Sequence, residues 1–91
     1  DVKYAEWSRD GKKIAYISSD EKLKPYITDI HILDLETRED KKITRSNMYI
    51  WDLVWSPNDK YIGFRGHDLS WGLTTHVKIW IIESSGGEIR L

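Results

Sequence analysis

The segment Trp55-Ser56-Pro57-Asn58-Asp59-Lys60-Tyr61-Ile62-Gly63-Phe64 has a second copy in this chain. The copy is Trp7-Ser8-Arg9-Asp10-Gly11-Lys12-Lys13-Ile14-Ala15-Tyr16, 48 positions earlier. Further along, Ile79-Trp80-Ile81-Ile82-Glu83 matches Ile30-His31-Ile32-Leu33-Asp34 at an offset of 49. A repeat of this length is typical of solenoids and β-propellers. We therefore expect an all-β chain of two consecutive four-stranded antiparallel propeller blades, with blade 1 in residues 1–45 and blade 2 in residues 46–91.

Each copy contains a polar turn between two strands. Gly11 stands where a type I turn followed by a bulge needs a positive φ angle, and its counterpart in the second copy is Asp59. Aspartate tolerates the left-handed region better than most residues, at a cost of about 1 kcal/mol relative to glycine. The second turn is therefore expected to be the more strained.

Alternating apolar residues predict strands along the whole chain. In blade 2, Ile50 and Val54 alternate with Trp51, Leu53 and Trp55, so both faces of the sheet are apolar and should be covered. Two blades alone leave an apolar face at each end, which indicates part of a ring of about six to eight blades. No segment has the apolar spacing of a helix. The predicted strands are residues 2–7, 13–18, 27–35, 39–44, 49–55, 60–65, 76–83 and 88–91.

The composition excludes several classes of function. The 91 residues include 14 basic and 15 acidic side chains with a formal net charge of -1, so we expect no nucleic acid partner. No apolar run approaches membrane-spanning length, so we expect no membrane partner either. Cysteine is absent, which excludes disulfides and thiolate zinc sites and is compatible with the cytoplasm, our expected location. The chain enters its first strand directly at Asp1, so we expect a piece of a longer polypeptide.

Residues 65–76 contain the candidate site side chains. Ser70, His67 and Asp68 lie too close in sequence to form a catalytic triad, whose members come from separate elements. His67 and His76 lack the short spacing of metal ligands. We therefore expect no catalytic, cofactor-binding or metal-binding residue. The simplest interpretation is that these side chains support the backbone of a long loop. The functional alternative is a loop facing a partner or substrate, formed by Arg65, His67, Asp68, Trp71 and His76.

The repeated segment, with the later Ile79-Trp80-Ile81-Ile82-Glu83, resembles the propeller repeat shared by the translocation protein TolB and the prolyl oligopeptidase family of serine peptidases. Residues 65–76, Arg-Gly-His-Asp-Leu-Ser-Trp-Gly-Leu-Thr-Thr-His, are similar to a segment of acylaminoacyl peptidase-like members. The sequence departs from the family pattern at Arg9, Asp59 and Trp71.

This resemblance implies a non-catalytic propeller that restricts peptide access to an α/β-hydrolase domain outside this chain. The implied partners are neighbouring blades, that hydrolase domain and the peptide substrates of the parent peptidase. The alternative is a TolB-like propeller that binds proteins and has no enzymatic activity. A third possibility is a separate chain whose copies associate into a ring.

Overall fold

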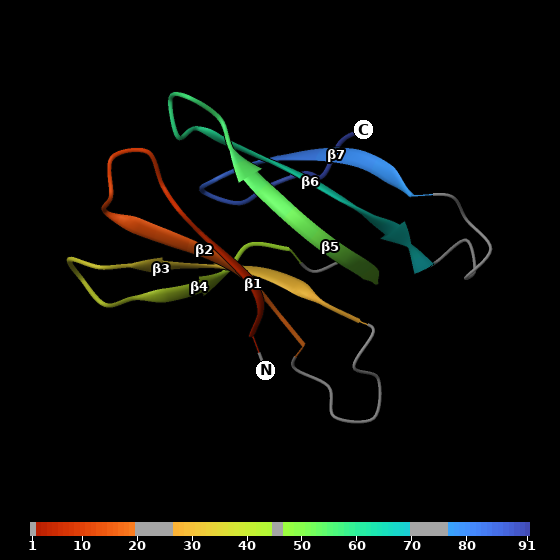
Figure 1. Ribbon diagram of the computed structural model, residues 1–91, viewed down its shortest axis with the longest axis horizontal. Coiled ribbons are helices and arrows are strands. Elements are labelled where there is room, and N and C mark those ends of the chain that lie inside the picture. Colours follow the sequence, from red (N-terminus) through yellow and green to blue (C-terminus); the bar gives the residue numbers. More distant parts are fainter. Residues whose placement is uncertain (1, 20–26, 45–46, 70–76) are drawn as a thin grey trace.

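The computed structural model describes residues 2–19, 27–44, 47–69 and 77–91. These residues form two antiparallel sheets, each with its strands in sequence order (Figure 1). The first sheet contains β1 (Val2–Trp7), β2 (Lys13–Ser18), β3 (Asp29–Asp34) and β4 (Asp40–Lys42). The second contains β5 (Met48–Trp55), β6 (Tyr61–Asp68) and β7 (Lys78–Glu83). The all-β fold and its two-sheet organisation are confirmed.

Several of the predicted strands need correction, and two of them matter most for the candidate site and the end of blade 2. Residues 88–91 form no strand, and they contact β7 through the isolated bridge between Ile81 and Arg90. Gly86 and Gly87 have φ angles of 98° and 135°, so the chain leaves the extended conformation before it can pair along β7. Strand β6 continues three residues beyond the predicted end at Arg65. In the part of the chain that the structure describes, no helix is long and apolar enough to cross a membrane.

The two repeated turns have the same hydrogen bonds. In blade 1 the Ser8 hydroxyl donates to Asp10 Oδ1 at 2.7 Å and accepts from the Lys13 amide at 3.0 Å. The Ser56 hydroxyl makes the equivalent bonds at the same distances, with Asn58 Oδ1 and the amide of residue 61. The φ angles of Gly11 and Asp59 are 74° and 60°, which confirms the left-handed conformation predicted at both positions.

The blades meet along β1 and β5, and the two repeated turns lie side by side at one end (Figure 1). The Asp59 carboxylate accepts from the amides of Arg9 and Asp10 at 2.8 and 3.1 Å. We call this contact the Asp59 latch. The Trp55 indole Nε1 donates to the Glu6 carbonyl at 3.0 Å. Side chains of blade 2 therefore satisfy polar backbone atoms of blade 1.

At the other end of the junction, Thr28 links the blades. Its amide donates to the Met48 carbonyl at 2.9 Å, and its hydroxyl accepts from the Ile50 amide at 2.7 Å. Thr28 was predicted to lie within a strand of blade 1, but β3 begins at Asp29. The backbone of Thr28 is paired with blade 2 instead, which explains the shorter strand.

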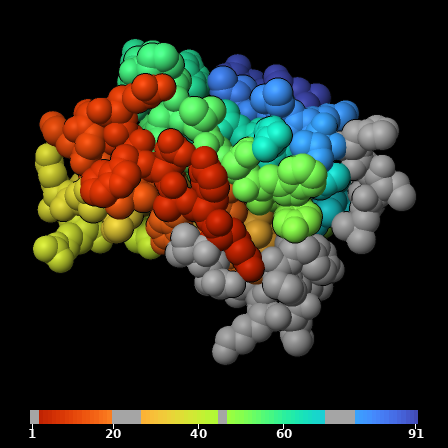
Figure 2. Space-filling model, viewed as in Figure 1, coloured from red at the N-terminus to blue at the C-terminus, as the bar shows by residue number. Residues whose placement is uncertain are grey.

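The core lies between the two sheets, and it takes one face from each (Figure 2 shows blade 1 in red to yellow and blade 2 in green to blue). Its members are Ala15, Ile17, Ile30, Ile32, Ile43, Met48, Ile50, Leu53, Trp55, Ile62, Phe64, Trp80 and Ile82. Side chains alternate between the core and the other face in β3 and β7, where Ile30, Trp80 and Ile82 are buried. The opposite face of each sheet stays open, as predicted for a pair of blades without further neighbours.

Strand β5 departs from the predicted alternation. The pairing with β6 shifts between Ile50 and Asp52, which is a β-bulge at Trp51. A bulge inserts one extra residue and reverses the side on which the preceding side chains lie. Ile50 therefore joins Leu53 and Trp55 in the core, whereas Trp51 is 44% exposed. The sequence-based grouping of Trp51 with Leu53 and Trp55 was wrong for this reason.

Candidate functional site

The extension of β6 to Asp68 changes the setting of the candidate residues. His67 and Asp68 were predicted to belong to a loop and Arg65 to end the strand before it, but all three lie within β6. Arg65 and His67 are two positions apart and share the open face of blade 2, whereas Asp68 pairs with the buried Met48 on the other face. Trp71 and His76 lie outside the described residues. The structure thus brings together two of the five candidates.

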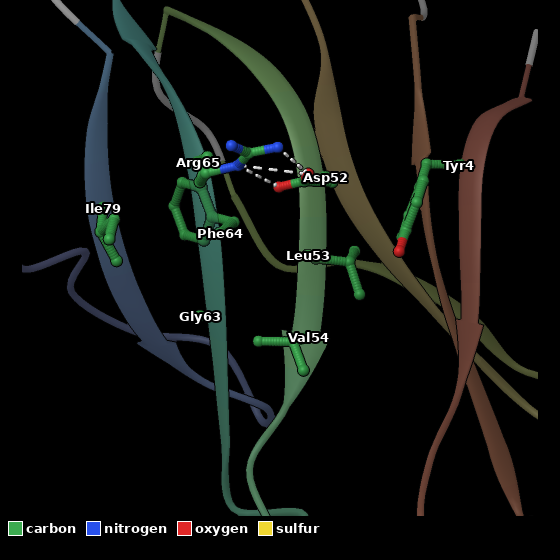
Figure 3. A pocket seen from close by; sticks show the side chains of 8 residues that line it. All are labelled: Tyr4, Asp52, Leu53, Val54, Gly63, Phe64, Arg65 and Ile79. Carbon is green, nitrogen blue, oxygen red and sulfur yellow. Dashed lines mark hydrogen bonds and ion pairs between the residues drawn. The ribbon is translucent and has the colours of Figure 1, made fainter.

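Arg65 forms an ion pair with Asp52 on the neighbouring strand β5 (Figure 3). Its Nε lies 3.0 Å from Asp52 Oδ1, and its Nη2 lies 2.5 Å from Asp52 Oδ2, which is the bidentate geometry that arginine favours with a carboxylate. The hydrogen bonds from Arg65 lower the pKa of Asp52 below its usual value, and the same contact raises the pKa of Arg65. The pair is therefore ionised at neutral pH.

A pocket of about 300 Å³ lies beside this ion pair (Figure 3). Its walls are mostly apolar, and they come from three strands of blade 2 together with Tyr4 of β1. The Tyr4 hydroxyl donates to Glu6 at 2.9 Å, and this hydrogen bond is the main cause of the raised pKa of Tyr4. The lining residues are Tyr4, Asp52, Leu53, Val54, Gly63, Phe64, Arg65 and Ile79.

Three aromatic rings meet at the end of blade 2 where β5 begins. The ring centroids of Trp51 and His67 are 5.3 Å apart, and those of Tyr49 and His67 are 6.2 Å apart. Tyr49 and Trp51 are 40% and 44% exposed. We call Tyr49, Trp51 and His67 the aromatic cluster.

Gly66 makes the aromatic cluster possible. A Cβ atom at Gly66 would lie 2.4 Å from the Tyr49 carbonyl oxygen, so no residue with a side chain fits without a backbone shift. The Trp80 indole donates to the Gly66 carbonyl at 3.2 Å and holds β6 against β7. This close approach of β5 to β6 brings Tyr49 opposite His67.

The chemistry of this surface suits recognition. Among the residues that the structure describes, no group of three or more histidine, aspartate or glutamate side chains could hold a metal ion. The Asp52 carboxylate is neutralised by Arg65, and the His67 ring contacts two aromatic rings. Aromatic residues and arginine are both enriched at protein–protein interfaces relative to the rest of the surface.

The sequence analysis did not identify Tyr4, Tyr49, Asp52 or Ile79 as part of this surface. A comparison of the two repeats could have identified the aromatic cluster. Tyr49, Trp51 and His67 correspond, 48 positions earlier, to Asp1, Lys3 and Ser19. Residues that build the blade should recur in both copies, so three aromatic positions without aromatic counterparts indicate a feature specific to blade 2.

No protein-family model matches the chain, and no curated protein matches it either. Among solved structures, the chain is similar to a protein from Agrobacterium tumefaciens assigned as TolB, with a TM-score of 0.65 and 22% sequence identity. The match covers 98% of this chain and 28% of that protein, so the chain spans between a quarter and a third of its length. The likeness shows the fold: the chain has the architecture of a segment of a TolB-type β-propeller.

Proposed function

We propose that this chain is a non-catalytic propeller segment that binds proteins or peptides through the aromatic cluster. The observation that carries the proposal is the mutual contact of three partly exposed rings at positions that the repeat does not require. Tyrosine and tryptophan are enriched among the residues that dominate binding energy at protein interfaces. The adjacent ion pair adds a polar group at the rim of the cluster.

Peptides selected from a random library on the wild-type chain test this proposal. We expect Trp51→Ser to weaken their binding by a factor of about 30, as truncation of a central interface aromatic does. Leu91→Ser is a suitable control, because Leu91 is an exposed apolar residue outside the aromatic cluster. Failure to select any peptide, or equal affinity in Trp51→Ser, would contradict the proposal.

The narrower form of the proposal is that the segment restricts peptide access to a serine peptidase active site elsewhere in a parent protein. It is supported by the resemblance of residues 65–76 to acylaminoacyl peptidase-like enzymes, of which 65–69 are described here. A fluorophosphonate probe, which labels the activated serine of such enzymes, should then label the parent protein and not this chain. A parent without labelling but with peptide binding would support the TolB-like alternative. The cytoplasmic location remains part of the peptidase proposal.

A further inference from the structure

We propose that copies of this chain associate head to tail, with the open face of blade 2 in one copy against the open face of blade 1 in the next. The inference rests on the repeat architecture and is independent of the proposed peptide binding. We call the open face of blade 1 the leading face, and it contains Trp7, Ile14, Tyr16 and Leu33. The open face of blade 2 is the trailing face, and it contains Val54, Gly63, Ile79 and Ile81.

The two open faces occupy the repeat positions of the faces that already pack together inside the chain. Ile30 of blade 1 is 0% exposed against blade 2, whereas its equivalent Ile79 is 71% exposed. Trp55 is 3% exposed against blade 1, whereas its equivalent Trp7 is 61% exposed. The leading face of blade 1 therefore has the repeat positions that blade 2 buries at the internal junction. The trailing face of blade 2 has the repeat positions that blade 1 buries there. A second copy supplies both halves in the correct order.

One hydrogen bond of the internal junction can recur between copies. Inside the chain, the Trp55 indole donates to the Glu6 carbonyl. The equivalent atoms of an intermolecular junction are the Trp7 indole of one copy and the Val54 carbonyl of the other.

The Asp59 latch cannot recur between copies. Its carboxylate corresponds to Gly11, which has no side chain, and its Arg9 amide donor corresponds to Pro57, which has no N–H. The intermolecular junction should therefore be weaker than the internal one and should depend on protein concentration. This difference also supplies a gain-of-function test, because two substitutions would install the missing latch.

The proposed association leaves Trp51 of the aromatic cluster accessible. Lys3, which is the repeat equivalent of Trp51, stays exposed in blade 1 although blade 2 covers the adjoining face. By the same geometry, Trp51 should stay accessible when a second copy covers the trailing face. The Trp7→Glu variant, which alters the leading face and lies outside the candidate site, should therefore associate less and still bind the peptides selected on the wild type. Failure of either proposal can thus be recognised separately.

Light scattering coupled to gel filtration, over a hundredfold range of protein concentration, provides the first test. We expect the wild type to shift from monomer to larger species, and Ile79→Glu to remain monomeric. Leu91→Glu is the matched control, because Leu91 is 69% exposed and Ile79 is 71% exposed. A wild type that stays monomeric throughout, or association that persists in Ile79→Glu, would overturn the proposal.

The double variant Gly11→Asp/Pro57→Arg provides the second test. Asp59 shows that aspartate adopts this conformation, and a Cβ at Gly11 has no heavy atom within 4 Å. We expect this variant to associate about fivefold more tightly than the wild type, from two added hydrogen bonds at an exposed site. Unchanged or weaker association would show that the copies do not meet in the register of the internal junction.

The direction of association can be tested by cross-linking, since the chain has no cysteine of its own. The single variants Lys12→Cys and Pro57→Cys place a thiol in the repeated turn of blade 1 and of blade 2, respectively. In a head-to-tail assembly, these two turns of neighbouring copies meet. The two variants, one of them isotopically labelled, are mixed and treated with a flexible bis-maleimide. We expect the main product to be a dimer that contains one copy of each variant. Efficient cross-linking of either variant with itself would indicate a symmetric face-to-face dimer and would overturn the head-to-tail arrangement.

Discussion

Trp7 and Trp55 occupy the same position of the repeat and end the first strand of their blades, yet they differ in environment. Trp55 lies between the blades with its indole bonded to Glu6, whereas Trp7 lies on the open face of blade 1. Each is followed by a serine whose hydroxyl makes the same turn hydrogen bonds. The difference in environment therefore arises from the neighbouring sheet. The contribution of a repeated residue to folding stability therefore depends on whether a neighbouring blade covers it.

Truncation of these two tryptophans gives the largest expected contrast. Trp55→Ala should cost about 3–5 kcal/mol, because it leaves a cavity in the junction and removes the bond to Glu6. Since a domain of this size has little more stability than that, this variant should be largely unfolded. Trp7→Ala should cost less than about 1 kcal/mol, since the side chain is exposed. Urea unfolding followed by circular dichroism measures both, and equal losses would contradict the covered and open faces.

The second contrast concerns Gly63 and Gly66 of β6, which differ in the space available for a side chain. Gly63 corresponds to Ala15, and a Cβ at Gly63 would lie 3.6 Å from the nearest atom, on Val54. Gly63→Ala should therefore be neutral or slightly stabilising. Gly66→Ala would place its Cβ against the Tyr49 carbonyl and should cost about 1–3 kcal/mol. The thermal midpoints of the two variants measure the difference, and a tolerated Gly66→Ala would show that β5 can move away from β6.

These contrasts show which features could be predicted from the sequence. The offset of 48 and the turn residues were sufficient for the strands β1 and β2, the positive φ at Asp59 and the open faces, because each depends on local chemistry repeated in the chain. The bulge at Trp51 was not predictable, since nothing in an apolar run marks where an extra residue enters. The positive φ of Arg38, at 64°, was missed for a similar reason, because arginine is not a turn signal.

The candidate site was predicted less well than the fold. Residues 65–76 were singled out by resemblance, and Arg65 and His67 do lie on the open surface of blade 2. Their partners Asp52, Tyr49 and Trp51 come from β5, and the contacts depend on a strand register that the bulge alters. A cross-strand pair can be identified from sequence where the alternation is regular, and this pair lies beside the irregularity.

The two turns offer a third contrast. Gly11→Ala should cost about 1 kcal/mol, because alanine adopts a positive φ poorly in otherwise open space. Asp59→Ala should cost more, about 2 kcal/mol, since it removes both hydrogen bonds of the Asp59 latch and retains the unfavourable φ. Asp59→Gly relieves the backbone while losing the latch, so its loss should be the smaller of the two Asp59 variants. If Asp59→Gly were as damaging as Asp59→Ala, the φ angle would contribute nothing.

The smallest contrast separates two cross-strand pairs at the same repeat positions. Tyr4 pairs with Ile17 in blade 1, and Asp52 pairs with Arg65 in blade 2. Because Arg65 lowers the pKa of Asp52 in the folded state, the ion pair stabilises the fold above the pKa of an unfolded aspartate, about 3.9, and this contribution is lost as the pH falls through the lowered value. Asp52→Asn should therefore lower the urea midpoint slightly at pH 7 and less at pH 3.

Since the side chains of Asp52 and Arg65 are both partly exposed, 1 M salt should shrink the difference at pH 7. A difference that is the same at both pH values would show that Asp52 acts through packing and not through its charge.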